Sequence, residues 1–156
     1  MGGIGTALGS LLSTFRVLSL NTPYEGLTQI ANVLAPVGPI APNNPDDVKV
    51  VQNLLHGLTM TRLIGSFVTV PQVTGKFDAT TGFWIFYWQS VWAGRHGTAV
   101  DGTVSPAQGG AMYGGHIWFI AKLNAAANKA NPTVYKRFIS ALSTGGAAAR
   151  EFGISS

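Results

Sequence analysis

Two copies of one local pattern, lying on either side of a strongly aromatic stretch, constrain the fold of this chain more than any other sequence feature. The first copy spans residues 74–81 (TGKFDATT) and the second spans residues 101–108 (DGTVSPAQ). In each, a glycine is followed two positions later by an apolar residue and then by a capping residue, Asp78 or Ser105. Glycine lets the backbone turn without strain at Cβ, and Asp or Ser accepts a hydrogen bond from a first-turn N–H group. The pattern therefore predicts two helices that each begin after a glycine-anchored turn.

The second of these helices is predicted to begin at Pro106. Ser105 and Gln108 have the spacing of a capping box, and proline is well tolerated at the first helical position. Apolar residues of this helix would be Met112, Tyr113, Ile117, Trp118, Ile120, Ala121 and Leu123. The glycine pairs at 109–110 and 114–115 each cost a helix about 1 kcal/mol per residue relative to alanine. We therefore expect either a close helix–helix contact there or a broken helix.

Other helix signals lie on both sides of this region. Asn44 and Asn131 are each followed by a proline, which predicts helices beginning at Pro45 and Pro132. Apolar spacing predicts a helix over residues 4–18, and TPYE at residues 22–25 has the form of another capping box. Three prolines in residues 35–42 indicate a boundary, and residues 63–73 are expected to form an extended loop.

The helix predicted over residues 79–93 is apolar on every side. Its first face carries Thr81, Trp84, Ile85, Trp88 and Trp92, and its opposite side carries Phe83, Phe86 and Tyr87. A helix that is hydrophobic all round is normally buried all round. We therefore expect the second aromatic side to be covered by the chain's own extensions, by another copy of the protein, or by a ligand.

The order of these residues resembles the signature of the peptidoglycan-binding-domain-like family. That signature runs V-x-x-L-Q-x-x-L, then G-x-F-x-x-x-T-x-x-A-V-x-x-F-Q, then D-G-x-V-G, and the resemblance covers residues 46–125. The positions assigned to the motif are Gln52, Gly75, Phe77, Asp78, Thr81, Trp88, Gln89, Gly102, Ser105 and Gln108. The resemblance implies a small three-helix module of the kind that binds cell-wall polymers.

The expected fold is therefore all-α. A three-helix bundle like that of the peptidoglycan-binding family would occupy residues 43–128 and include a long extended loop. Residues 1–42 would form an N-terminal helical extension with a proline-rich linker. Residues 129–156 would form a C-terminal helix and tail packed on the module.

Composition narrows the classes of partner. Only 10% of the 156 residues are charged, the formal net charge is +4, and there is no cysteine. A basic balance favours anionic partners, but no basic cluster exceeds Lys136 and Arg137, so we expect no nucleic-acid binding. Residues 1–12 resemble neither a secretory signal nor a transmembrane segment. No lysine or arginine comes before the hydrophobic part of this segment, and glycines interrupt that part. The localisation stays open; an extracellular or cell-surface site would require a non-classical route.

No catalytic motif is present, and the chain is expected to be a non-enzyme without a cofactor or metal. It has no H-E-x-x-H, G-x-S-x-G, P-loop or dinucleotide fingerprint. His96 and Asp101 are close in sequence, but they lack a third ligand at a spacing typical of zinc sites.

Two functions are consistent with these sequence features. The first is a non-catalytic module that binds a cell-wall glycan or its peptide stems through an aromatic platform and polar groups, with Trp92, Arg95, His96 and Asp101 as the expected site. The second is a structural subunit that assembles into a homo-oligomer, filament or sheath. The self-association candidates are Phe83, Phe86 and Tyr87 together with Leu8, Leu11 and Phe15.

Overall fold

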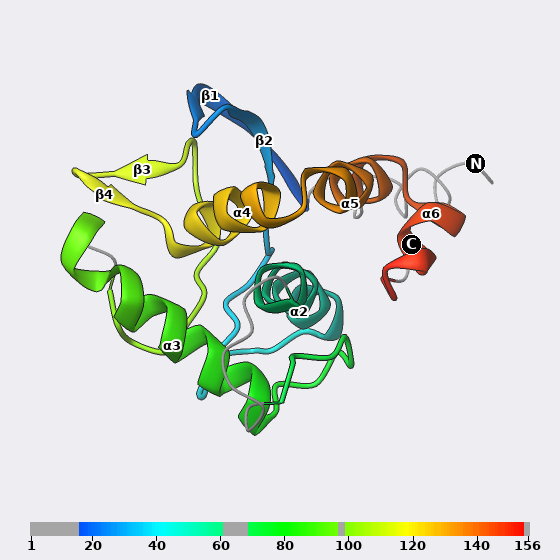
Figure 1. The fold of residues 1–156 in the computed structure, drawn as a ribbon, viewed down its shortest axis with the longest axis horizontal. Coiled ribbons are helices and arrows are strands. Elements are labelled where there is room, and N and C mark those ends of the chain that lie inside the picture. Colours follow the sequence, from blue (N-terminus) through cyan, green and yellow to red (C-terminus); the bar gives the residue numbers. More distant parts are fainter. Residues whose placement is uncertain (1–15, 61–68, 97–98, 155–156) are drawn as a thin grey trace, which may run out of the picture.

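A computed structural model describes residues 16–60, 69–96 and 99–154 (Figure 1). The elements in chain order are β1 (Val17–Tyr24), β2 (Leu27–Ala31), α2 (Pro45–Met60), α3 (Ala79–His96), β3 (Met112–Tyr113), β4 (His116–Ile117), α4 (Phe119–Ala130), α5 (Pro132–Thr144) and α6 (Gly146–Glu151). The strands form two antiparallel pairs, β1 with β2 and β3 with β4. The expectation of an all-α fold is therefore wrong, and the protein combines helices with two small sheets.

The helix expected after residue 22 is replaced by the β1–β2 hairpin. Tyr24 pairs with Leu27 across a two-residue turn, in which Glu25 has φ 49° and Gly26 has φ 78°. Positive φ at both central residues is the geometry of a type I′ turn, which joins antiparallel strands and cannot belong to a helix. The capping-box spacing of residues 22–25 wrongly predicted a helix, because the turn at Glu25 and Gly26 determines the local structure. Of the helix expected over residues 4–18, residues 4–15 lie outside the described part, and Val17 and Leu18 belong to β1.

The helix expected from Pro106 is also wrong. Residues 105–108 have no regular structure, β3 and β4 form a hairpin, and α4 begins only at Phe119. Gly114 and Gly115 occupy the turn of this hairpin with φ of 51° and 84°. Ser105 and Gln108 therefore cap no helix. The glycine pairs mark turns in an irregular segment rather than close contacts between helices.

Three helix starts are confirmed. α2 begins at Pro45, and Val48 N–H donates to the Asn44 carbonyl at 2.9 Å. Asp78 caps α3, because its Oδ1 accepts hydrogen bonds from Thr81 N–H at 2.8 Å and from the Thr81 hydroxyl at 2.7 Å. Asn131 caps α5 by accepting from Val134 N–H at 3.2 Å. The side chains of Asp78 and Asn131 each satisfy an N–H group that the helix itself cannot pair, whereas the bond at Asn44 is the first backbone bond of α2.

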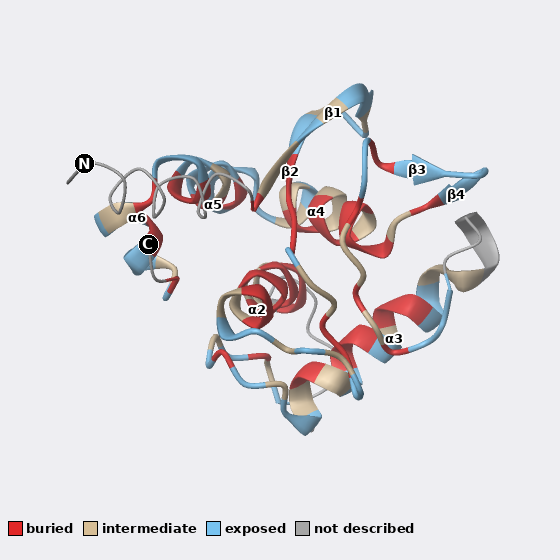
Figure 2. Cartoon of the chain, turned by 180° about the vertical axis from the view of Figure 1, so that it is seen from behind, coloured by how far each residue is buried: buried red, intermediate tan, exposed pale blue. Residues whose placement is uncertain are grey.

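One hydrophobic cluster joins segments from the whole described chain. Figure 2 shows buried positions along α2 and on the inner sides of α3 and α4. Strand β2 and the segment after it contribute Ile30 and Val33, and the C-terminal region contributes Leu142 and Ile154. The cluster's largest fully buried side chains also include Leu54, Leu55, Trp84, Ile85, Ile120 and Leu123. None of the described helices is both long and apolar enough to cross a membrane.

The outer aromatic side of α3 stays partly exposed. The inner face, which includes Trp84, Ile85 and Trp88, is buried as expected. Phe83 is 49% exposed and Phe86 is 55% exposed, whereas Tyr87 is half-buried and stacks on Phe83 with ring centroids 6.1 Å apart. The expectation that the chain covers this side is thus not met for Phe83 and Phe86 by the described residues. Leu8, Leu11 and Phe15 lie outside the described residues.

Candidate functional site

The first glycine turn is held by the side-chain amide of Gln52, which projects from α2. Its Oε1 accepts hydrogen bonds from Thr74 N–H at 2.8 Å and Gly75 N–H at 2.9 Å. Its Nε2 donates to the Lys76 carbonyl at 3.0 Å and to the Thr81 hydroxyl at 3.0 Å. Gly75 has φ 80°, a conformation that favours glycine. Gln52 therefore fixes both the turn and the first turn of α3.

The second glycine turn repeats this arrangement with Gln89 of α3. Gln89 Oε1 accepts from Gly102 N–H at 2.8 Å, and Nε2 donates to the Thr103 carbonyl at 3.0 Å and to Asp101 Oδ1 at 3.2 Å. Gly102 has φ 74°. In both copies, a buried glutamine on one helix secures the glycine turn that follows that helix. These motif positions thus have a structural role.

Other motif residues pack rather than bond. The ring of Phe77 lies 3.1 Å from the position that a Cβ on Gly82 would occupy, so the glycine permits a close contact between this ring and α3. Trp88 is buried on the inner face of α3.

The four expected ligand-binding residues are only partly brought together. Asp101 belongs to the glycine turn, where its Oδ1 accepts from Thr103 N–H at 3.0 Å as well as from Gln89. Trp92 lies about one turn before the end of α3 and is half-buried. The side chains of Arg95 and His96 lie outside the described part of the structure. Of Trp92 and Asp101, whose side chains the structure describes, Trp92 lines one of the two hollows described next.

Trp92 lines a groove of about 400 Å³ between α3, the end of α4 and the tip of the β1–β2 hairpin, which we call the Trp92 groove. Its lining residues are Tyr24, Glu25, Leu58, Trp88, Trp92, Lys122, Ala125, Ala126, Lys129 and Ala130. Trp92 stacks on Trp88 with ring centroids 5.3 Å apart, and it also contacts Phe119 at 5.8 Å. This packing fixes the orientation of the Trp92 ring.

The charges of the groove are predominantly positive. Lys122 Nζ lies 5.6 Å from the centre of the Trp92 ring, which is a cation–π distance, and Lys129 adds a second ammonium group. Glu25 is the one carboxylate among the groove's described lining residues. Burial, and then the charge of Glu25, raise the pKa of Tyr24. The Tyr24 hydroxyl therefore stays protonated and able to donate a hydrogen bond.

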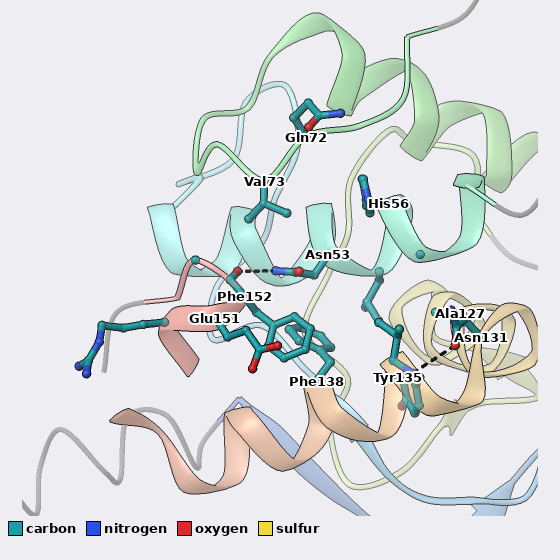
Figure 3. A pocket seen from close by; sticks show the side chains of 15 residues that line it. Asn53, His56, Gln72, Val73, Ala127, Asn131, Tyr135, Phe138, Glu151 and Phe152 are labelled. Carbon is teal, nitrogen blue, oxygen red and sulfur yellow. Dashed lines mark hydrogen bonds between the residues drawn. The ribbon is translucent and has the colours of Figure 1, made fainter. Parts of the chain in front are cut away.

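A second hollow of about 490 Å³ lies in front of α2 and is walled by α5 and α6; we call it the α5–α6 pocket (Figure 3). Figure 3 shows Gln72 and Val73 on one side, Phe138 and Tyr135 on the opposite side, and Asn131 and Phe152 towards the two ends. Sequence reasoning missed this pocket. A sequence feature that could have indicated it is Gly57, a glycine in the interior of a helix whose other residues favour helix formation.

No reactive constellation is evident among the residues that the structure describes. No three His, Asp or Glu side chains in those ranges are placed to hold a metal ion. Burial raises the pKa of Tyr135 well above its ordinary value of about 10, and its hydroxyl donates to Asn124 at 2.6 Å. Tyr135 is therefore a structural hydrogen-bond donor, not an acid near neutral pH.

Comparisons of the chain with protein-family models, curated proteins and solved structures gave no match. Its function has to follow from the geometry of the described residues.

Proposed function

We propose that the protein is a non-catalytic module that binds an anionic cell-wall glycan, or the peptide stems attached to it, in the Trp92 groove. The observation that carries this proposal is a groove that combines a fixed tryptophan ring, a lysine over that ring and a second lysine in the lining. Aromatic rings offer a flat apolar surface to a sugar or an apolar side chain, and lysine ammonium groups attract carboxylates. The net charge of +4 acts in the same direction by favouring approach of a polyanion.

The two lysines are expected to contribute differently. Lys122 lies over the Trp92 ring, so it would meet an anionic substituent of a group that contacts that ring. Lys129 is exposed near the end of α4 and forms no ion pair with the described residues. A substitution of Lys129 therefore tests the charge of the groove without also removing a contact with the Trp92 ring, as a substitution of Lys122 would.

Sedimentation of the purified protein with peptidoglycan sacculi at physiological salt tests the proposal. We expect the wild type to sediment with the sacculi, Trp92→Ala to lose retention, and Lys129→Glu to bind about fivefold more weakly. Lys136→Glu is the matched control, because it makes the same charge change on α5 at a residue that does not line the groove. Absence of retention, or an equal loss in both lysine variants, would refute a groove-specific site.

A second function is favoured by the outer side of α3. Phe83, Phe86 and Val91 are all more than 40% exposed there, and the side carries no charge to oppose self-association. Exposed contiguous apolar surface of this kind typically marks an interaction site. A self-assembling structural subunit could therefore use the same fold, and wall binding and assembly do not exclude each other.

A further inference from the structure

The α5–α6 pocket has an apolar floor and a rim of mostly uncharged polar side chains. Leu54, Ala127, Tyr135 and Phe138 line it and are buried. Phe138 and Phe152 form an aromatic wall with ring centroids 5.2 Å apart. The walls come from several packed helices, so the hollow is already shaped before any ligand enters, which is typical of small-molecule sites.

Gly57 keeps one wall of this pocket open. It lies inside α2 and lines the pocket, and a Cβ added there would meet no atom of the described residues within 4 Å. A glycine inside a helix costs about 1 kcal/mol relative to alanine. No close packing in the described structure accounts for this cost, and the result is additional space in the pocket.

The polar groups that α2 contributes to the pocket are hydrogen-bond acceptors. Asn53 Nδ2 donates to the carbonyls of Lys49 at 2.9 Å and Phe152 at 3.0 Å, which leaves its Oδ1 to accept. His56 Nδ1 lies 2.8 Å from the Pro71 carbonyl. A carbonyl can only accept, so Nδ1 carries the hydrogen and Nε2 of the neutral ring is an acceptor. Neither of these acceptors receives a hydrogen bond from the described residues.

The opposite rim adds one more acceptor and two donor groups. Gln72 Nε2 donates to the Val70 carbonyl at 3.3 Å, and its Oε1 accepts nothing from the described residues. Asn131 Oδ1 accepts from Val134 N–H at 3.2 Å, so its Nδ2 is the group left to donate. These four side chains therefore offer three acceptors, with Asn131 Nδ2 and the second hydrogen of Gln72 Nε2 as donors.

Charge contributes little to this site. Glu151 forms an ion pair with Arg137 outside the pocket lining, and Arg150 is the other charged residue of the lining. The lining thus carries one carboxylate that is already paired and one exposed guanidinium group, while its other polar side chains are neutral amides, a histidine and a phenol. The best ligand would bring several hydroxyl donors, one acceptor and an apolar face.

We propose that the α5–α6 pocket binds a neutral sugar residue and that this site is independent of the Trp92 groove. Sugar hydroxyls both donate and accept, so they can satisfy Asn53, His56 and Gln72 while one accepts from Asn131. The C–H face of the ring would lie against Phe138 and Phe152. An alkyl chain would leave the three acceptors unsatisfied, at a cost for every one that is desolvated.

An NMR titration of the full chain with chitobiose and with maltose tests the proposal. At least one disaccharide is expected to cause saturable shifts centred on the amides of residues 53–57, 131 and 133–135. Gly57→Leu, which fills the open wall, should weaken binding roughly tenfold or more. Gly57→Ala is the matched control and should retain binding, because one methyl group meets no atom there.

Two further variants separate the possible outcomes. Gln72→Leu removes an exposed acceptor without disturbing a helix and should weaken binding about threefold to tenfold, even if Gly57→Leu does not fold. Lys129→Glu should leave sugar binding unchanged while it weakens retention on sacculi, so the two proposed sites can fail separately. The proposal is overturned if neither disaccharide causes saturable shifts, if the shifts centre on the Trp92 groove, or if 1-hexanol binds the pocket while both sugars do not.

Discussion

Side-chain amides hold the irregular segments of this chain by bonding the N–H and C=O groups of short stretches of backbone. Five such amides occur in the described residues, and each both donates to and accepts from the main chain. Asn32 holds Ala107, Asn43 holds Gly38, Asn124 holds Ala31, Gln52 holds the turn at Gly75, and Gln89 holds the turn at Gly102. An amide carries a donor and an acceptor side by side, as a neighbouring strand would, and buried backbone groups require such partners.

Replacing Gln52 should be severe. Gln52→Leu keeps a similar volume but leaves the N–H groups of Thr74 and Gly75 and the Lys76 carbonyl without this partner. An unsatisfied buried polar group costs about 1–3 kcal/mol, so we expect the free energy of unfolding to fall by about 3 kcal/mol or more. Urea denaturation measures this change. Gln108→Leu, at an exposed position, should change stability by less than about 0.5 kcal/mol, and equal effects in the two variants would contradict the role of Gln52.

Tyr135 should make the protein sensitive to alkali. Burial raises its pKa, so the folded state holds the phenol proton more tightly than the unfolded state does. This contribution to stability is complete below the unfolded pKa of about 10 and is lost as the pH rises above it. Thermal unfolding at pH 8 to 11 should show a steep loss of stability in the wild type and a shallower one in Tyr135→Phe. Some slope should persist because the pKa of Tyr24 is also raised. Parallel pH curves would contradict the assignment.

At the scale of elements, Asp47 joins α2 to the segment that precedes it. The residue is fully buried in the first turn of α2, and its Oδ1 accepts from Arg16 Nε at 3.2 Å and from Leu34 N–H at 2.9 Å. Its Oδ2 accepts from Ala35 N–H at 3.2 Å. Asp47 therefore binds the start of the β1–β2 hairpin and the segment after it to the helix. These bonds go beyond the interaction with the helix dipole that any acidic residue in the first turn makes.

The neighbouring aspartate provides a matched control for this role. Asp47→Ala removes a carboxylate that pairs with a buried arginine, and it should destabilise the fold by about 3–5 kcal/mol. Asp46→Ala loses only the favourable position near the helix N-terminus, which is worth about 0.3–1 kcal/mol. Chemical denaturation of both variants gives the comparison. A loss below about 1 kcal/mol in Asp47→Ala would show that the connection is not important for stability.

On the scale of the whole molecule, low charge and exposed apolar surface act together. The net charge is +4 and the isoelectric point is about 9.7, so repulsion between copies weakens as the pH approaches that value. The outer side of α3 offers Phe83 and Phe86 as an uncharged contact surface. The two conditions favour association of identical copies.

Self-association should therefore increase with pH and protein concentration. Sedimentation velocity from pH 7 to pH 9.5 should show growing oligomers in the wild type, and electron microscopy would show whether these are ordered polymers. Phe83→Ser combined with Phe86→Ser should keep the protein monomeric, because it removes the apolar contact without changing net charge. A wild type that stays monomeric at high concentration throughout this pH range would exclude the assembly function.

The sequence by itself determined the features that depend on a few neighbouring residues. The start of α2 follows from the Asn44-Pro45 step, and those of α3 and α5 follow from side-chain caps at Asp78 and Asn131, because each signal acts within a single helical turn. Periodicity likewise identified the inner face of α3. The β1–β2 hairpin also depends on a local signal, the Glu25-Gly26 turn. The sequence nevertheless led to the prediction of a helix there, because the adjacent residues 22–25 have the spacing of a capping box.

Only the tertiary structure decided the features that depend on distant partners. Asn124 lies 93 positions from the Ala31 backbone that it holds, and no local pattern encodes that pairing. The Trp92 groove and the α5–α6 pocket also combine side chains from separate helices. Their shapes arise where packed elements leave space, which depends on how the whole core closes and not on the spacing of residues along the chain.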